Sequence, residues 1–312
     1  MLDIVRRAVD ASNATNPWTN VYGLSRSLLA GATAATLLAS PTAALFRPAA
    51  GMPFAPYCVG PLGWSFFCVL PGNLELHRYL AAAALLIVAS GWRPRFTAIP
   101  HWWLTWSFAA SATLVDGGDQ ASAILTLLLV PIALTDPRRW HWSPDAARPS
   151  NQSRLLANSA LLAIRVQVAG IYLHSSLGKL AVTEWVDGTA LYYWFTDPNF
   201  GAPGWLRPIL DWILAAPLGV VLLTWGPLAL EFALATALLL PAGPRAALLR
   251  LGIAFHLSIA VFMGISTFAV AMIAALVLYL RAPSEVLEIP APLRSVLRPV
   301  AGVRARRRPA LA

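Results

Sequence analysis

The sequence predicts an all-α polytopic membrane protein with about eight transmembrane helices. Hydrophobic residues make up 58% of the 312 residues, charged residues only 12%, and the mean hydropathy is +0.63. A soluble domain carries about 25% charged residues because its surface must be solvated. The arginines lie between the apolar segments and at the C-terminal end, a pattern that orients membrane proteins. The net charge of +9 is therefore attributed to membrane orientation, and nucleic acid is not an expected partner.

Eight apolar segments are candidates for transmembrane helices, which need about 20 residues to cross the hydrocarbon core. They are residues 26–46, 78–92, 101–115, 120–135, 156–178, 217–240, 246–263 and 266–281. They define a predicted transmembrane domain over 26–282, between a cytoplasmic N-terminal segment (1–25) and a basic, proline-rich cytoplasmic tail (283–312). A six-span alternative, in which 101–135 forms a re-entrant hairpin, stays open.

The basic residues predict which side of the membrane each loop faces. With the N-terminus inside, 18 arginines fall in cytoplasmic segments, four basic residues fall on the opposite side, and Arg165 lies within a span. Cytoplasmic loops of membrane proteins are enriched in Arg and Lys. Both termini of this multi-pass cell-membrane protein are therefore predicted to be cytoplasmic. The tail, with its arginine-rich end, is expected to be attracted to anionic lipid head groups of the bilayer.

Both cysteines, Cys58 and Cys68, fall in the first outer loop, residues 47–77. In an oxidising compartment two nearby thiols commonly form a disulfide, and a loop of this length is easily closed. The sequence therefore favours a disulfide in this loop, and two packed free cysteines are the alternative.

Half of the acidic residues also fall on the predicted outer side. Asp116 and Asp119 flank two glycines in the turn between the third and fourth spans, and glycine permits a tight reversal. Two close carboxylates can share a proton, bind a cation, or be solvated at a hairpin tip. We expect no metal site from the sequence.

The segment from His174 to Gly188, at the end of the fifth span, holds the strongest candidates for chemistry. Lys179 is the only lysine, whereas 22 other basic positions are arginine. Lysine can lose its proton when it is desolvated, and arginine effectively cannot. Lys179 is therefore a candidate base, and an interfacial anchor is the alternative.

Three polar residues, Arg165, Glu231 and His256, are predicted within spans, where ionisable groups are costly and face the bundle interior. Counted from the predicted cytoplasmic ends, they lie at similar depths of about 12–15 Å. The sequence thus predicts an Arg165–Glu231 ion pair with His256 nearby. Arg165, Tyr172 and Lys179 fall on one stripe of the fifth span, which would aim Lys179 at the bundle axis.

Two parts of the chain resemble a known membrane domain. Residues 178–180 (Gly-Lys-Leu) and 184–188 (Glu-Trp-Val-Asp-Gly) resemble a Lys-Leu…Trp-Val-Glu-Gly segment of the vitamin K-dependent γ-carboxylase membrane domain. Residues 255–257 (Phe-His-Leu), with the following run to Met272, are similar to another helix of that domain. The chain is identified on these motifs as a member of the horizontally transferred transmembrane (HTTM) superfamily.

Within that superfamily, the resemblance is greatest to the sporulation-delaying protein B (SdpB) branch. It rests on the overall length, the paired outer cysteines, the Asp-Gly-Gly-Asp turn at 116–119, and the motif that begins at Tyr192 and ends at Asp197-Pro198. The branch is linked to the maturation of a secreted peptide toxin. The resemblance therefore implies a peptide substrate and a small companion maturation protein as partners. The outer-face motif of Glu184, Trp185, Asp187, Gly188 and Asp197 would take part.

The carboxylase resemblance implies a second function. There the counterpart of Lys179 acts as a base in vitamin K chemistry, so the alternative is a membrane enzyme acting on a peptide, quinone or lipid. Asp116, Asp119 and His174 are its further catalytic candidates, and a quinone is the cofactor type that the resemblance implies. The carboxylase also has a large luminal domain and an Asn-Asn-His turn, and this chain has neither. Carboxylation itself is therefore not expected. A transporter or immunity protein is the third alternative.

Overall fold

The computed structural model describes residues 15–48, 51, 54–69, 72–143, 149–198 and 201–288. Eight long helices form its frame: α2 (Asn20–Ala39), α5 (Leu74–Ala89), α6 (Pro94–Ser111), α7 (Gly117–Leu134), α8 (Asn151–Leu180), α12 (Pro217–Ala235), α13 (Ala242–Met263) and α14 (Ser266–Leu280). Short helical turns lie between them: α3 (Thr42–Leu45), η1 (Gly60–Trp64), α4 (Phe66–Val69), α9 (Thr183–Val186), α10 (Ala190–Thr196), α11 (Arg207–Leu214) and η2 (Ala237–Leu239). Most of the predicted cytoplasmic N-terminal segment and tail lies outside the described residues.

Each of the eight predicted spans overlaps one long helix. By length and composition, four helices in the described part of the chain can cross a membrane: α7, α8, α12 and α13. Helix α14 is apolar but shorter. The chain is thus a helical membrane protein, and the crossing of all eight helices stays a prediction, as does the orientation of the termini.

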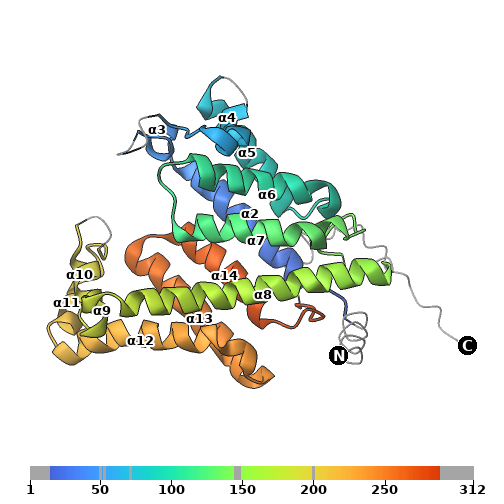
Figure 1. The fold of residues 1–312 in the computed structure, drawn as a ribbon. Helices are drawn as coiled ribbons and strands as arrows, with labels where there is room; N and C mark the ends of the chain where they lie inside the picture. The colour runs from blue at the N-terminus through green and yellow to red at the C-terminus, as the bar shows by residue number, and fades with distance from the viewer. Residues whose placement is uncertain are drawn as a thin grey trace, which may run out of the picture.

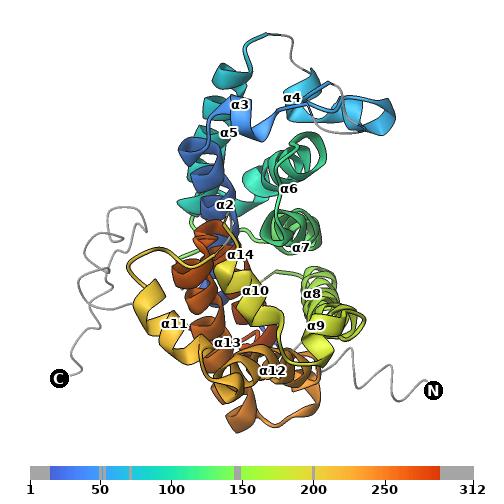
Figure 2. The same ribbon diagram turned by 90° about the vertical axis from the view of Figure 1, so that its left-hand side faces the viewer.

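The helices form two groups that meet at α14 (Figures 1 and 2). Helices α2, α5, α6 and α7 form one group, and α8, α12 and α13 lie on the other side of α14, which packs against α2, α7, α8 and α13. The main apolar core joins α2, α7, α8 and α14 around fully buried side chains such as Leu29, Leu125, Ile164 and Leu276. Helix α8 therefore has one face in this core and another available to the surroundings.

Helix α8 shows why the sequence pattern is that of a membrane helix. Leu162, Val166, Leu173 and Leu177 expose 45–61% of their surface along one stripe of the helix. Apolar side chains exposed in this number and at helical spacing are expected to face lipid. The opposite stripe carries the polar groups of the candidate site and faces the bundle.

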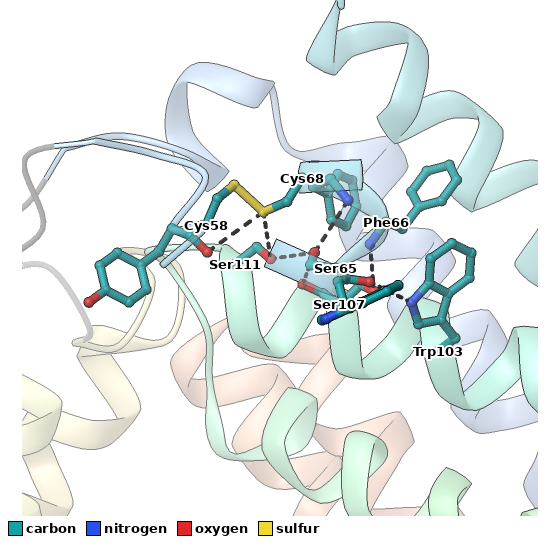
Figure 3. The surroundings of a disulfide bond; sticks show 10 residues. Cys58, Ser65, Phe66, Cys68, Trp103, Ser107 and Ser111 are labelled. Carbon is teal, nitrogen blue, oxygen red and sulfur yellow. Dashed lines mark hydrogen bonds between the residues drawn. A yellow bond between two sulfur atoms is a disulfide. The ribbon is translucent and has the colours of Figure 1, made fainter. Parts of the chain in front are cut away.

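The predicted disulfide between Cys58 and Cys68 is present in the segment between α2 and α5 (Figure 3). Its Cα atoms are 5.7 Å apart. The loop is also held to α6, because Trp103 Nε1 donates to the carbonyl oxygen of Trp64 at 2.9 Å, and Ser107 Oγ accepts from the backbone N–H of Phe66 at 2.9 Å. The disulfide and these hydrogen bonds fix the loop against one group of helices, away from Lys179 on α8.

Two of the arginines counted for orientation are buried inside the protein. Arg26 is fully buried on α2 and donates to Thr97 Oγ1 at 2.7 Å. Arg138 forms a buried ion pair with Asp136, with Nη2 and Oδ2 2.8 Å apart. Arg26 thus joins α2 to α6, and Arg138 joins residues within the loop after α7, so their positive charge has a structural role that the count could not identify.

Candidate functional site

Lys179 and Glu231 form the centre of the candidate site. Lys179 lies in the last turn of α8, and its Nζ is 2.6 and 2.9 Å from the two carboxylate oxygens of Glu231 on α12. The side chains are 21% and 7% exposed, respectively. Because the pair is mostly desolvated, each charge depends on the other for its stabilisation.

Ser175 completes this ion pair. It stands one turn before Lys179, so the two side chains lie on the same face of α8. Lys179 Nζ donates to Ser175 Oγ at 2.6 Å, and Ser175 Oγ donates to Glu231 Oε2 at 3.1 Å. The three groups form a closed hydrogen-bonded triangle, which fixes the position of the ammonium.

A second buried pair lies deeper in the same helix group. The hydroxyl of Tyr172 and Nε2 of His256 on α13 are 2.8 Å apart, and both residues are 2% exposed. The His256 ring packs edge-on against Phe268 of α14, with centroids 5.7 Å apart. Nδ1 of His256 is buried and has no hydrogen-bond partner among the described residues. Tyr172 thus connects the stripe of α8 to α13 and α14.

Three aromatic side chains, Trp185, Tyr193 and Trp194, form an aromatic wall near the end of α8. Trp185 of α9 lies over Lys179, whose Nζ is 5.3 Å from the ring centroid, in the range of a cation–π contact. A pocket of about 210 Å³ opens beside it, and its lining includes Glu184, Tyr193 and Trp194. The pocket offers flat apolar surfaces and one carboxylate close to a buried ion pair. Tyr193 and Trp194 belong to the Tyr-Tyr-Trp-Phe motif, which the sequence associated with a family but with no site.

Asp187 and Gly188 form the turn that positions this wall. Asp187 Oδ1 accepts hydrogen bonds from the backbone N–H and the hydroxyl of Thr189 at 3.1 and 2.7 Å. Gly188 has a φ of +81°, and an added Cβ would lie 3.2 Å from Cγ2 of Val221. Glycine is needed here because it adopts a positive φ without strain and because a larger residue would crowd Val221. Within the outer-face motif, Asp187 and Gly188 therefore have structural contacts.

Asp116 and Asp119 form a helix cap at the start of α7. Asp116 Oδ1 accepts from the backbone N–H groups of Gly118 and Asp119 at 2.7 and 3.0 Å, and Asp119 Oδ2 accepts from the N–H of Asp116 at 3.2 Å. This is a capping box, which satisfies free N–H groups at a helix start. The structure shows no contact between these carboxylates and Lys179. Phe268 lies close to this turn and to His256: an added Cβ at Gly118 would be 2.8 Å from the Cα of Phe268, and the Phe268 ring packs on His256.

His174 and Asp197 are not brought to Lys179. His174 is exposed on α8, outside the stripe that carries Ser175 and Lys179. Asp197 ends α10, and its carbonyl oxygen accepts from the N–H of Gly201 at 2.9 Å. The role of His174 beside Lys179 that the sequence suggested has no support in this geometry.

The predicted Arg165–Glu231 ion pair is wrong. Arg165 Nη2 donates instead to the backbone carbonyl of Arg281, at the end of α14. The depth estimate counted Arg165 inwards from residue 156, but α8 begins at Asn151 and Arg165 lies beside the end of α14, where it meets Arg281. Glu231 instead meets Lys179, fourteen residues or about 21 Å along α8 from Arg165.

The Lys179–Glu231 pair holds an ammonium and a carboxylate in a poorly solvated position, where another hydrogen-bond acceptor could replace Glu231. No group of three His, Cys, Asp or Glu side chains suited to a metal ion is found in the described part of the chain. The residues do not fit a quinone: the pocket of about 210 Å³ is smaller than typical ligand sites of roughly 300 Å³ or more, and the Lys179 ammonium is turned to Glu231 and Ser175. We therefore derive no step through a quinone.

Comparisons with known proteins agree with the family resemblance. The HTTM domain matches residues 69–283, a range that includes both Lys179 and Glu231. Sporulation-delaying protein SdpB of Bacillus subtilis (strain 168) is 36% identical over 268 residues, which cover 85% of this chain and 82% of that protein. Uncharacterized protein YitO of the same organism is 38% identical over 287 residues, covering 90% of this chain and 91% of the relative. No solved structure gives a significant match.

Proposed function

Because this chain belongs to the HTTM family, on its SdpB branch, we propose that it is a membrane protein that assists the maturation or export of a secreted antimicrobial peptide. The similarity to SdpB supports this proposal, since it extends over 85% of the chain. A small companion maturation protein is the proposed second partner. The proposal includes eight spans in the cell membrane with both termini in the cytoplasm, supported by the asymmetry of the arginines.

The observation that carries the proposed role is the desolvated Lys179–Glu231 pair beneath an aromatic wall. A single side chain of a bound peptide that enters the pocket lies next to Trp185 and Tyr193. A carboxylate or carbonyl oxygen of the peptide can then compete with Glu231 for the ammonium. In this mechanism Lys179 binds the peptide by exchanging its hydrogen bond to Glu231 for one to the peptide oxygen. The aromatic rings contact the apolar side chains of the peptide.

The orientation determines where this exchange takes place. With the N-terminus inside, α8 runs outwards, and Lys179 lies in its last turn. The pocket then faces the extracytoplasmic side, where a secreted peptide is processed. The disulfide in the first outer loop is consistent with this side, because disulfides persist in oxidising compartments.

The test compares secreted peptides from a deletion strain complemented with wild-type protein, Lys179→Ala or Arg207→Ala. Both variants remove one cation, but Arg207 is exposed on α11 and does not line the pocket. We expect the mature peptide to be lost in the deletion strain and with Lys179→Ala, and retained with Arg207→Ala, at matched amounts of membrane protein. An unchanged secreted-peptide profile in the deletion strain would overturn the proposal. Full secretion with Lys179→Ala would overturn the role of the ion pair.

A membrane enzyme with Lys179 as a base is the second candidate. Its support is that the sole lysine is mostly buried and corresponds, by resemblance, to the carboxylase base. Lys179→Arg separates the two functions, because arginine keeps the charge but cannot act as a base. A substrate-dependent covalent change in the secreted peptide, lost in Lys179→Arg, would favour the enzyme; unmodified peptide would favour assistance. The third alternative, a transporter or immunity protein with a polar cavity around Arg165 and Glu231, stays a prediction, although Glu231 pairs with Lys179 and Arg165 with the carbonyl of Arg281.

A further inference from the structure

A second pocket, of about 520 Å³, lies at the opposite end of the α8 stripe from Lys179. Four arginines line it: Arg165 of α8, Arg245 and Arg250 of α13, and Arg281 at the end of α14. Glu285 is the one acidic residue in its lining. Helix α8 and the consecutive helices α13 and α14 thus place four guanidinium groups around one cavity with a single carboxylate in its lining.

The hydrogen bonds of these arginines leave much of their donor capacity unused. Arg165 donates to the carbonyl of Arg281, and Arg245 Nε donates to the carbonyl of Leu240 at 2.6 Å. Glu285 pairs with Arg281. Within the residues that the structure describes, no ion pair neutralises Arg165, Arg245 or Arg250, and the buried Nε of Arg165 has no hydrogen-bond partner.

Like charges held together at the edge of a membrane domain are costly unless an anion neutralises them. Guanidinium groups present several donors in a fixed fork, which matches the oxygens of a phosphate group. The cavity opens where α13 begins and α14 ends, which is the cytoplasmic end in the proposed orientation. Two exposed leucines are chain neighbours of residues at the pocket: Leu251 follows Arg250, and Leu239 precedes Leu240, whose carbonyl accepts from Arg245; they are 56% and 86% exposed.

We propose that this pocket binds the phosphate head group of an anionic membrane phospholipid. The four arginines would hold the phosphate oxygens, and the exposed leucines would contact the acyl chains. Basic pockets between transmembrane helices on the cytoplasmic side are suited to anionic lipid head groups. The bound lipid would hold α8, α13 and α14 together. The Lys179–Glu231 pair lies at the other end of this group of helices.

The experiment uses the purified full chain and native mass spectrometry with added phosphatidylglycerol, phosphatidylcholine or glycerol 3-phosphate. The variant Arg245→Gln/Arg250→Gln removes two charges from the pocket without changing the half-buried Arg165. The control, Arg95→Gln/Arg139→Gln, removes two exposed arginines from the same predicted side but outside the pocket. All samples must elute as monodisperse protein.

We expect the wild type and the control to retain phosphatidylglycerol in preference to phosphatidylcholine. The Arg245→Gln/Arg250→Gln variant should lose affinity for phosphatidylglycerol by about thirtyfold, since two arginines near a membrane surface contribute roughly that factor. Equal retention of the two lipids, or equal loss in the control and the pocket variant, would overturn the proposal. Competition by glycerol 3-phosphate at the same concentration as the lipid would assign the site to a soluble phosphate compound and overturn the lipid assignment.

Discussion

The Lys179–Glu231 ion pair makes a quantitative prediction about stability. The side chains are 21% and 7% exposed and 2.6 Å apart, so removal of one partner leaves a charge in a poorly solvated position. Breaking a buried pair costs about 3–5 kcal/mol, and the partly exposed lysine places this pair near the lower limit. We expect Glu231→Gln and Lys179→Met each to reduce the free energy of unfolding by about 3 kcal/mol.

The double substitution Lys179→Met/Glu231→Gln should cost clearly less than the sum of the two single effects. Once one charge has been removed, the other is already unpaired, so its removal costs only about 1 kcal/mol more instead of about 3 kcal/mol. We expect a coupling free energy of roughly 2 kcal/mol, within the range for residues in direct contact. The measurement is a double-mutant cycle on protein in detergent, with unfolding followed by denaturant or heat under reversible conditions.

Arg165 supplies the control for this cycle. Arg165 lies about 21 Å along α8 from Lys179, so Arg165→Gln and Glu231→Gln should be additive within about 0.5 kcal/mol. Additive effects of Lys179→Met and Glu231→Gln would refute the ion pair. Coupling between Arg165 and Glu231 instead would restore the pairing that the sequence first predicted.

Three further predictions concern the outer loops. Mass-tag alkylation should label Cys58 and Cys68 only after reduction; two labels without a reductant would contradict the disulfide. A cysteine introduced at Thr189, in a background lacking both native cysteines, should react with an impermeant thiol reagent in intact cells, and labelling only after lysis would reverse the proposed orientation. Gly188→Ala should lower the free energy of unfolding by about 1–2 kcal/mol because its φ is +81°, and wild-type melting behaviour would contradict the strained turn.

The sequence predicted the helices well because hydropathy reports the local preference of each segment for lipid or core. Each predicted span overlaps one long helix, and the disulfide was predicted from the shared loop of Cys58 and Cys68. The family was predicted from short motifs whose residues are fixed by close packing, such as Gly188 against Val221. These are properties of single segments, so one sequence is sufficient to recognise them.

Side-chain partners depend on how far one helix slides along another, and hydropathy does not determine that distance. Glu231 was assigned to Arg165 because the two seemed equally deep when each helix was counted from its predicted end. In the structure Arg165 lies beside the end of α14 and Glu231 beside the last turn of α8, so the two residues are at different levels of the bundle. A stronger clue was present in the spacing of Ser175 and Lys179, which places a hydroxyl and an ammonium on one face of α8 and leaves both in need of an acceptor. A glutamate on an adjacent helix satisfies both donors.

Helix α8 carries two charged sites at different levels. Glu231 neutralises Lys179 in the last turn, so no acidic residue of α12 is left for Arg165 in the middle of the helix. Arg165 lies among Arg245, Arg250 and Arg281, with only Glu285 to oppose them in the pocket lining. One helix therefore contributes both to a closed ion pair beside the aromatic wall and, about 21 Å away, to an excess of positive charge. This is why the candidate peptide site and the proposed lipid site should respond independently to mutation, although one helix carries residues of both.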